Sequence, residues 1–226
     1  DLTPAYNNTQ YDENNSKGKV SKVIRNLLYL TQNDQLIIYD HIKTTNANYK
    51  KKWLLHTINR PIIDNLNVLK GELDNGISQS HSSTASIINS NAQMQLTKLL
   101  PKKAIMKLIG GKDYQYYIET DGNDSIINGK NFNQGVIEKK WFDNSLWRIE
   151  ISPEKAALED DFIIVLSPNM NKNHPVRIKN APVLSGNAIG IEIEKTMVIF
   201  AQPDKHKKII INIPVRKNKL LLIGAN

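Results

Sequence analysis

The chain has 226 residues, of which 40% are apolar and 23% are charged, and it contains no cysteine. This composition is typical of a globular protein that is long enough to bury its own core. The absence of cysteine excludes a disulfide scaffold, thiolate metal ligands and cysteine catalysis. No apolar stretch reaches the length of about 18 residues that a membrane-spanning helix needs. The chain begins at Asp1 with no signal peptide, so we interpret it as a processed product or a piece of a longer protein.

Positive charge is concentrated towards the C-terminus. The formal net charge is +8, and residues 172–226 carry 10 Lys and Arg against 3 Asp and Glu. A basic segment favours an anionic partner such as an acidic polysaccharide, a nucleic acid or an anionic lipid, and its sign does not choose among them. The change in charge density follows a polar, proline-containing stretch, which predicts two domains, 1–171 and 172–226.

The first half of the chain begins with a predicted hairpin. Two apolar runs, Val20–Leu30 and Leu36–Asp40, flank the polar turn at 31–34. A third run, Trp53–Ile58, is stopped before Pro61, because proline removes a donor from the strand ladder.

Short apolar runs separated by turn residues continue to the C-terminus, which predicts an all-β protein. They are Met94–Leu100, Ala104–Ile109, Tyr114–Ile118, Trp147–Ile151, Phe162–Leu166, Ala188–Ile193, Met197–Phe200, Lys208–Ile213 and Leu220–Ile223. We expect an antiparallel β-sandwich, a large two-layer sheet, with a small C-terminal β-domain. One helix is predicted, at Pro153–Asp160, where Ser152 is a suitable cap and Pro153 suits the first turn.

Candidate catalytic groups do not form a recognisable constellation. The five histidines, His41, His56, His81, His174 and His206, are not at metal-ligand spacing. We interpret them as hydrogen-bonded residues of the core or rim, and a general base or zinc ligand is the alternative. The adjacent acids at 159–161 are interpreted as a solvated loop or a helix end. No catalytic residue and no metal ligand is predicted.

Lysines and aromatic residues are candidates for binding a glycan. Lys50, Lys51 and Lys52 form a basic run, and Tyr116 and Trp141 belong to a group of aromatic residues that could stack on sugars. The alternatives are that such lysines protect sheet edges and that the aromatic residues pack in the core. Lysine is a hydrated point charge, so it binds sulfate or phosphate less specifically than arginine does.

Apolar motifs in a fixed order and spacing resemble the C-terminal β-sheet region of heparinase II/III-like polysaccharide lyases, a group related to alginate lyases. The motifs are Asp1–Tyr6, Arg25–Leu30, Ile38–Ile42, Lys52–His56 with Pro61, Gly110-Gly111, Tyr116–Ile118, Trp147–Pro153 and Asp161–Leu166. The resemblance covers about residues 1–170 and implies a bacterial enzyme that is periplasmic or secreted. Such an enzyme cleaves uronic-acid-containing polysaccharides by β-elimination.

The resemblance also implies a partner domain and implies that the family's catalytic residues lie outside this chain. The family carries its catalytic Asn, His and Tyr in an N-terminal α/α-toroid, which this β-sandwich would brace while lining the substrate cleft. A further His and the ligands of a structural zinc lie in the family's opening β-strands, and no residue here matches them. The chain alone is therefore expected to lack lyase activity and to hold no cofactor.

Two alternatives to the lyase interpretation remain. The first is a stand-alone, non-catalytic carbohydrate-binding or adhesion module, which the sandwich pattern and the aromatic residues support. The second is nucleic-acid binding, which rests on charge alone. The chain lacks a basic stripe interleaved with aromatic residues, so we predict no nucleic-acid partner.

Overall fold

The regular secondary structure of the described residues is nearly all β-strand, as the apolar runs predict. The structure is a computed structural model that describes residues 1–8, 18–32, 34–119, 128–132, 146–169, 178–181, 188–194, 196–201 and 219–223. Two units make up the chain, Asp1–Met170 and Asn171–Asn226. Within the described residues, no helix has the length and hydropathy needed to cross a membrane.

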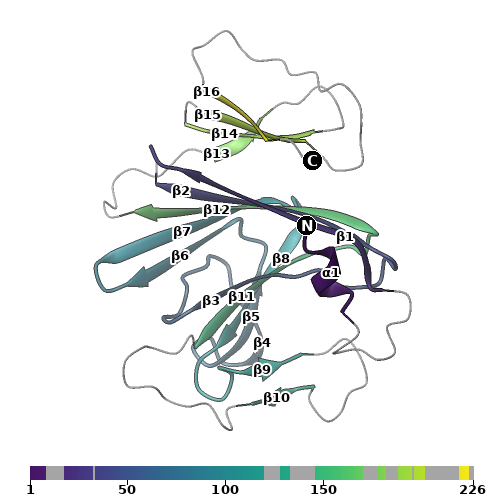
Figure 1. The fold of residues 1–226 in the computed structure, drawn as a ribbon. Helices are drawn as coiled ribbons and strands as arrows, with labels where there is room; N and C mark the ends of the chain where they lie inside the picture. The colour runs from purple at the N-terminus through teal and green to yellow at the C-terminus, as the bar shows by residue number, and fades with distance from the viewer. Residues whose placement is uncertain are drawn as a thin grey trace. The chain divides into compact units, whose positions relative to one another are not determined.

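The first unit is a sandwich of two five-stranded antiparallel sheets, drawn as two layers in Figure 1. In order across the sheet, sheet A contains β1 (Val20–Leu30), β2 (Gln35–Thr44), β12 (Glu159–Asn169), β7 (Ala92–Leu100) and β6 (Thr84–Asn89). Sheet B contains β3 (Trp53–Thr57), β11 (Trp147–Pro153), β8 (Ala104–Gly110), β5 (Gly76–Ser80) and β4 (Asn67–Gly71). Two short strands, β9 (Tyr117–Ile118) and β10 (Lys130–Asn131), pair with each other. The predicted all-β sandwich is confirmed.

The core lies between sheets A and B. Successive side chains of a strand point to opposite faces, so the alternate apolar residues of each strand meet in this layer. Ile149 and Ile151 of β11 are fully buried against Phe162 and Ile164 of β12. Burial of each such side chain stabilises the fold by about 1.5–3 kcal/mol.

The N-terminal residues cover part of the free edge of β1. The single-turn helix α1 (Thr3–Tyr6) was not predicted. The backbone N–H of Leu2 donates to the Val23 carbonyl at 2.8 Å, and the side chain of Asn7 bonds both backbone polar groups of Val20. These bonds satisfy groups that an uncovered edge strand would present to another chain.

The predicted hairpin is confirmed, and its strands are β1 and β2. Leu30 pairs with Gln35 next to the turn, and the pairing continues to Val20 and Thr44. The strand that begins at Trp53 ends at Thr57, before Pro61, as expected.

The helix predicted at Pro153–Asp160 is wrong. Pro153 is the last residue of β11 and pairs with Ala104, while Glu159 opens β12 and pairs with Lys43. Pairing with strands distant in the sequence therefore outweighs the local capping signal. The acids at 159–161 consequently lie on a strand rather than in a loop or at a helix end.

One predicted strand is shorter in the structure, and some strands of the structure are not predicted from the sequence. Of Tyr114–Ile118, only Tyr117 and Ile118 belong to a strand, because the Tyr114 N–H closes a turn onto the Gly111 carbonyl. Strands β4, β5 and β6 had no counterpart in the sequence prediction.

The described residues of the second unit form a four-stranded sheet with the order β13 (Ile178–Ala181), β14 (Ala188–Ile193), β15 (Thr196–Ala201) and β16 (Lys219–Ile223). The β15–β16 pair is parallel, whereas the other two pairs are antiparallel. The run Met197–Phe200 is at most 1% exposed, as expected for a strand with a neighbour on each side. The strand predicted at Lys208–Ile213 lies outside the described residues.

Candidate functional site

The outward face of sheet B carries polar side chains. In β11, Ile149 is buried in the core, while its neighbours Arg148 and Glu150 point to the opposite face. Backbone pairing places Glu150 beside Lys107 of β8, and Lys107 beside Gln79 of β5. The fold thus brings together polar residues from three strands that are far apart in the sequence.

A cleft with a volume of about 810 Å³ opens on this face. Its lining comes from outward positions of sheet B, the segment between β2 and β3, the β11–β12 connection, the start of β12, and residues in and near β9 and β10. The charged lining residues are Lys50, Lys51, Lys52, Lys70, Lys107, Lys155, Glu119, Glu150, Glu154 and Asp160. Six lysines against four carboxylates give this cleft an excess of positive charge.

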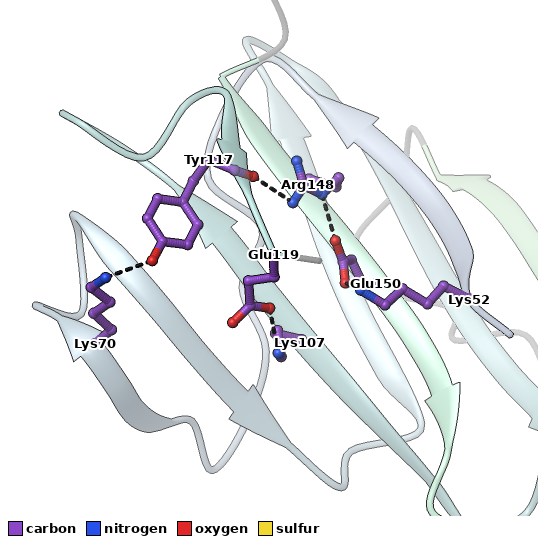
Figure 2. Close-up of polar contacts among 7 residues, drawn as sticks. All are labelled: Lys52, Lys70, Lys107, Tyr117, Glu119, Arg148 and Glu150. Carbon is purple, nitrogen blue, oxygen red and sulfur yellow. Dashed lines mark hydrogen bonds and ion pairs between the residues drawn. The ribbon is translucent and has the colours of Figure 1, made fainter. Parts of the chain in front are cut away.

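Glu150 holds two cations on the outward face of sheet B, as Figure 2 shows. Its Oε2 lies 3.0 Å from Lys52 Nζ, and its Oε1 accepts a hydrogen bond of 2.8 Å from Arg148 Nε. Burial opposes ionisation of this carboxyl, but the two cations outweigh that effect and lower the pKa of Glu150. Glu150 is therefore a fixed negative charge between two positive ones.

Two further lysines are held near Tyr117. Lys107 Nζ lies 2.6 Å from Glu119 Oε2, and Lys70 Nζ donates a hydrogen bond of 2.5 Å to the Tyr117 hydroxyl. The backbone carbonyl of Tyr117 accepts a bond of 3.0 Å from Arg148 Nη2. The hydrogen bond to Tyr117 is the main cause that raises the pKa of Lys70. Lys70 therefore stays charged, and its hydrogen-bond partner, the Tyr117 hydroxyl, brings no negative charge that would balance it.

Lys51 has a structural role in the wall of the cleft. Only 7% of the residue is exposed, and its Nζ donates to the Ala157 carbonyl at 2.5 Å and lies 2.9 Å from Asp160 Oδ2. The ion pair ties the segment before β3 to the start of β12, and the bond to Ala157 ties it to the connection between β11 and β12. Lys51 is thus poorly placed to contact a ligand directly.

The structure separates the residues predicted to bind a glycan. Lys50, Lys51 and Lys52 all line the cleft, and Lys50 is exposed. Tyr116 is half-buried and is not among the lining residues. Trp141 lies outside the described residues.

Several residues of the site were missed by sequence reasoning. They are Tyr49, Lys70, Lys107, Glu119 and Glu150, all of which line the cleft. The alternation of Arg148 and Glu150 with isoleucines in β11 was a signal for a polar outward face. The other missed residues join the cleft through strand pairing, which no local pattern reveals.

Trp147 and Tyr117, two further members of the aromatic group considered for sugar stacking, are buried by packing. Trp147 belongs to the main core, and Tyr117 packs with Ile77 and Ile109 in a smaller cluster on the outward face of sheet B. For these two residues the packing interpretation is confirmed.

The histidines that the structure describes differ in burial and in their hydrogen-bond partners. His41 is buried, and its Nδ1 lies 2.9 Å from Asp161 Oδ1. His81 is exposed, with Nδ1 3.0 Å from Glu154 Oε1. The hydrogen-bonded interpretation is confirmed for both. Burial and the nearby charge of Arg148 lower the pKa of His56.

The described residues contain no group of three or more His, Cys, Asp or Glu side chains that could hold a metal ion.

The site can hold an anion by charge and by hydrogen bonds. The lysine ammonium groups can donate to ligand carboxylates, and the glutamate oxygens can accept from ligand hydroxyls.

The chain matches no protein-family model and no curated protein sequence.

Proposed function

We propose that this chain is the β-sandwich portion of a bacterial polysaccharide lyase and that the sheet B cleft binds its uronic-acid-containing glycan. The observation that carries the proposal is the set of six lysines that line one cleft. The ordered apolar motifs of the first unit, which resemble those of heparinase II/III-like lyases, support the same function.

The charges in the cleft favour an anionic ligand. Glu150, Glu119 and Asp160 are each already paired with a lysine, at 3.0, 2.6 and 2.9 Å. Lys70 instead bonds a neutral phenol, and Lys155 is exposed. An approaching carboxylate therefore meets positive charge that the protein's own acids do not cancel.

The mixture of charges favours a glycan over a nucleic acid. The sugar-phosphate backbone of DNA has no hydrogen-bond donors and that of RNA has one hydroxyl per nucleotide, whereas a uronate polymer has more than one hydroxyl on each sugar. The carboxylates of Glu119, Glu150 and Glu154 line the same cleft as the lysines and can accept bonds from those hydroxyls. A polymer with alternating hydroxyls and carboxylates matches this surface.

The proposed role of this chain is to bind and orient the polymer. In β-elimination, the C5 proton of the uronate is removed, the C4–O bond breaks, and a double bond forms between C4 and C5. Following the family resemblance, we assign the base and the acid to the toroid portion of the parent enzyme.

The binding experiment uses the full chain and two pairs of substitutions. Affinity for oligouronate prepared from alginate is measured by calorimetry at two salt concentrations, with a neutral glucan as the negative ligand. The double variant Lys70→Gln/Lys155→Gln is compared with Lys43→Gln/Lys112→Gln, which removes two exposed lysines outside the cleft. We expect a loss of about tenfold in the first variant only. Affinity should also fall as salt rises.

Two results would count against the proposal. One is that the wild-type chain does not bind oligouronate at low salt. The other is that both double variants lose affinity equally, which would point to net charge instead of the cleft. Ultraviolet absorbance of unsaturated uronate is followed in the same mixtures, and growth would contradict the assignment of the chemistry to the toroid.

A further inference from the structure

Tyr49 is an exposed aromatic residue at the lysine-rich cleft. It lies between β2 and β3, it lines the cleft, and it is 42% exposed. The next residue, Lys50, is also exposed and lines the cleft. An aromatic side chain and an ammonium group thus reach the same cleft from adjacent positions.

The segment that carries Tyr49 is held by hydrogen bonds on its N-terminal side. The backbone N–H of Tyr49 donates to the Asn46 carbonyl at 3.1 Å, and the Asn48 N–H donates to Asn46 Oδ1 at 2.9 Å. The Thr45 N–H donates to the Lys19 carbonyl at 3.1 Å, which fixes the start of the segment beside β1. These bonds form a defined turn.

The segment is held on its C-terminal side by the buried ion pair described above. Lys51 Nζ lies 2.9 Å from Asp160 Oδ2, only two residues after Tyr49. The backbone on both sides of Tyr49 is therefore fixed. A ligand that stacks on the ring does not have to order this loop, so most of the interaction energy remains available for binding.

An exposed, preordered tyrosine is suited to stacking against a sugar ring. The face of a pyranose ring is lined by C–H groups, and an aromatic ring offers it an apolar surface with a negative face. Lysines alone attract any polyanion, so charge does not separate a polyuronate from a polyphosphate. An aromatic platform can make that distinction.

We propose that Tyr49 is the stacking platform that makes the cleft selective for a polyanion built of sugar rings. This inference rests on the proposed function and adds the residue that sets its specificity. In the bound state, one uronate ring lies on the Tyr49 side chain while lysines of the cleft engage carboxylates of the same chain. A ring-free polyanion engages the lysines only.

The experiment compares three tyrosine variants of the full chain. Tyr49→Ala removes the ring, Tyr49→Phe keeps the ring without its hydroxyl, and Tyr6→Ala removes a tyrosine that is 57% exposed and does not line the cleft. Affinities are measured for oligouronate, for linear polyphosphate of matched charge, and for single-stranded DNA. Circular dichroism and thermal unfolding check that each variant is folded.

We expect Tyr49→Ala to weaken oligouronate binding about fivefold. Tyr49→Phe and Tyr6→Ala should bind like the wild type, and polyphosphate binding should be the same in all four proteins. Unchanged oligouronate binding in Tyr49→Ala, or an equal loss for polyphosphate, would overturn the role of Tyr49 while leaving the proposed function intact.

Two other outcomes concern the ligand class. If wild-type protein binds no oligouronate, the proposed function fails and the role of Tyr49 in glycan selection fails with it. If single-stranded DNA binds more tightly than oligouronate and loses affinity in Tyr49→Ala, the platform serves nucleic-acid bases and the glycan assignment is overturned.

Discussion

Lys52 and Glu150 form an ion pair of 3.0 Å that links the residue before β3 to the middle of β11. The Glu150 side chain is only 7% exposed, and it also bonds Arg148. One carboxylate thus fixes two cations on the outward face of sheet B. A change of its charge should alter both the stability of the fold and the charge of the cleft.

Glu150 should make stability depend on pH. Its folded-state pKa is lowered because Lys52 and Arg148 outweigh the effect of burial, so its contribution is present above the ordinary glutamate pKa and is lost as the pH falls through the folded value. Glu150→Gln should lower the free energy of unfolding at neutral pH by about 1.5–3 kcal/mol. The difference from wild type should shrink below about pH 4.3.

Urea unfolding between neutral and acidic pH measures this effect. Glu72→Gln is the control, because Glu72 is exposed in the connection between β4 and β5. A constant difference between wild type and Glu150→Gln across the pH range would show that the two ion pairs do not contribute through charge.

His56 reports on the charge of Arg148 across the β3–β11 pair. The two residues are direct neighbours in the register, and burial together with Arg148 lowers the pKa of His56. In an NMR titration, its midpoint should lie below the ordinary value of about 6.5. Arg148→Gln should raise the midpoint, since a positive neighbour disfavours the charged imidazole.

The matched change for this titration is Arg60→Gln. It removes a guanidinium that lies 5.7 Å from the centroid of the Trp147 ring, and it should leave the His56 midpoint in place. Equal shifts in both variants would indicate a general loosening of sheet B rather than the loss of one charge.

Phe162 should be among the residues on which the core depends most. It is 1% exposed and packs between the two sheets, so truncation leaves a cavity. Phe162→Ala should reduce the free energy of unfolding by about 3–5 kcal/mol. Leu27→Ala, at a position that is 63% exposed, should change it by less than about 0.5 kcal/mol. Chemical unfolding of the full chain measures both, and similar losses would contradict the assignment of the core.

The sequence predicts the fold class because apolar and polar residues alternate in strands such as β11, where Ile149 and Ile151 face the core. It does not predict β4, because all five residues from Asn67 to Gly71 are exposed and no buried apolar pattern marks the strand. The false helix at 153–160 arose because local capping signals ignore pairing partners that lie far away in the sequence.

Prediction of the site has the same physical limit. The run at 50–52 is visible because its lysines are adjacent, although one of them proves to be a buried structural residue. Lys107 and Glu150 are 43 positions apart in the sequence, and only the β8–β11 register makes them neighbours. Tyr49 was overlooked because its exposure depends on the turn at Asn46 rather than on an aromatic cluster.

Two glycines with similar backbone conformations should differ sharply in their tolerance of a side chain. Gly111 has φ +80°, and Gly129 has φ +75°. A Cβ at Gly111 would lie 2.2 Å from the Asp74 carbonyl oxygen, whereas at Gly129 the nearest heavy atom is the Tyr117 hydroxyl at 3.5 Å. Gly129→Ala therefore costs only the left-handed backbone strain, about 1–2 kcal/mol.

Gly111→Ala should cost clearly more than Gly129→Ala, because the backbone at Asp74 has to move as well. The difference between the two free energies of unfolding, measured in urea, isolates the steric clash from the conformational strain. Gly129→Ala also places a methyl group near the Tyr117 hydroxyl at the cleft without disturbing β8. Equal losses in the two variants would mean that the connection after β8 moves freely enough to relieve the clash with Asp74.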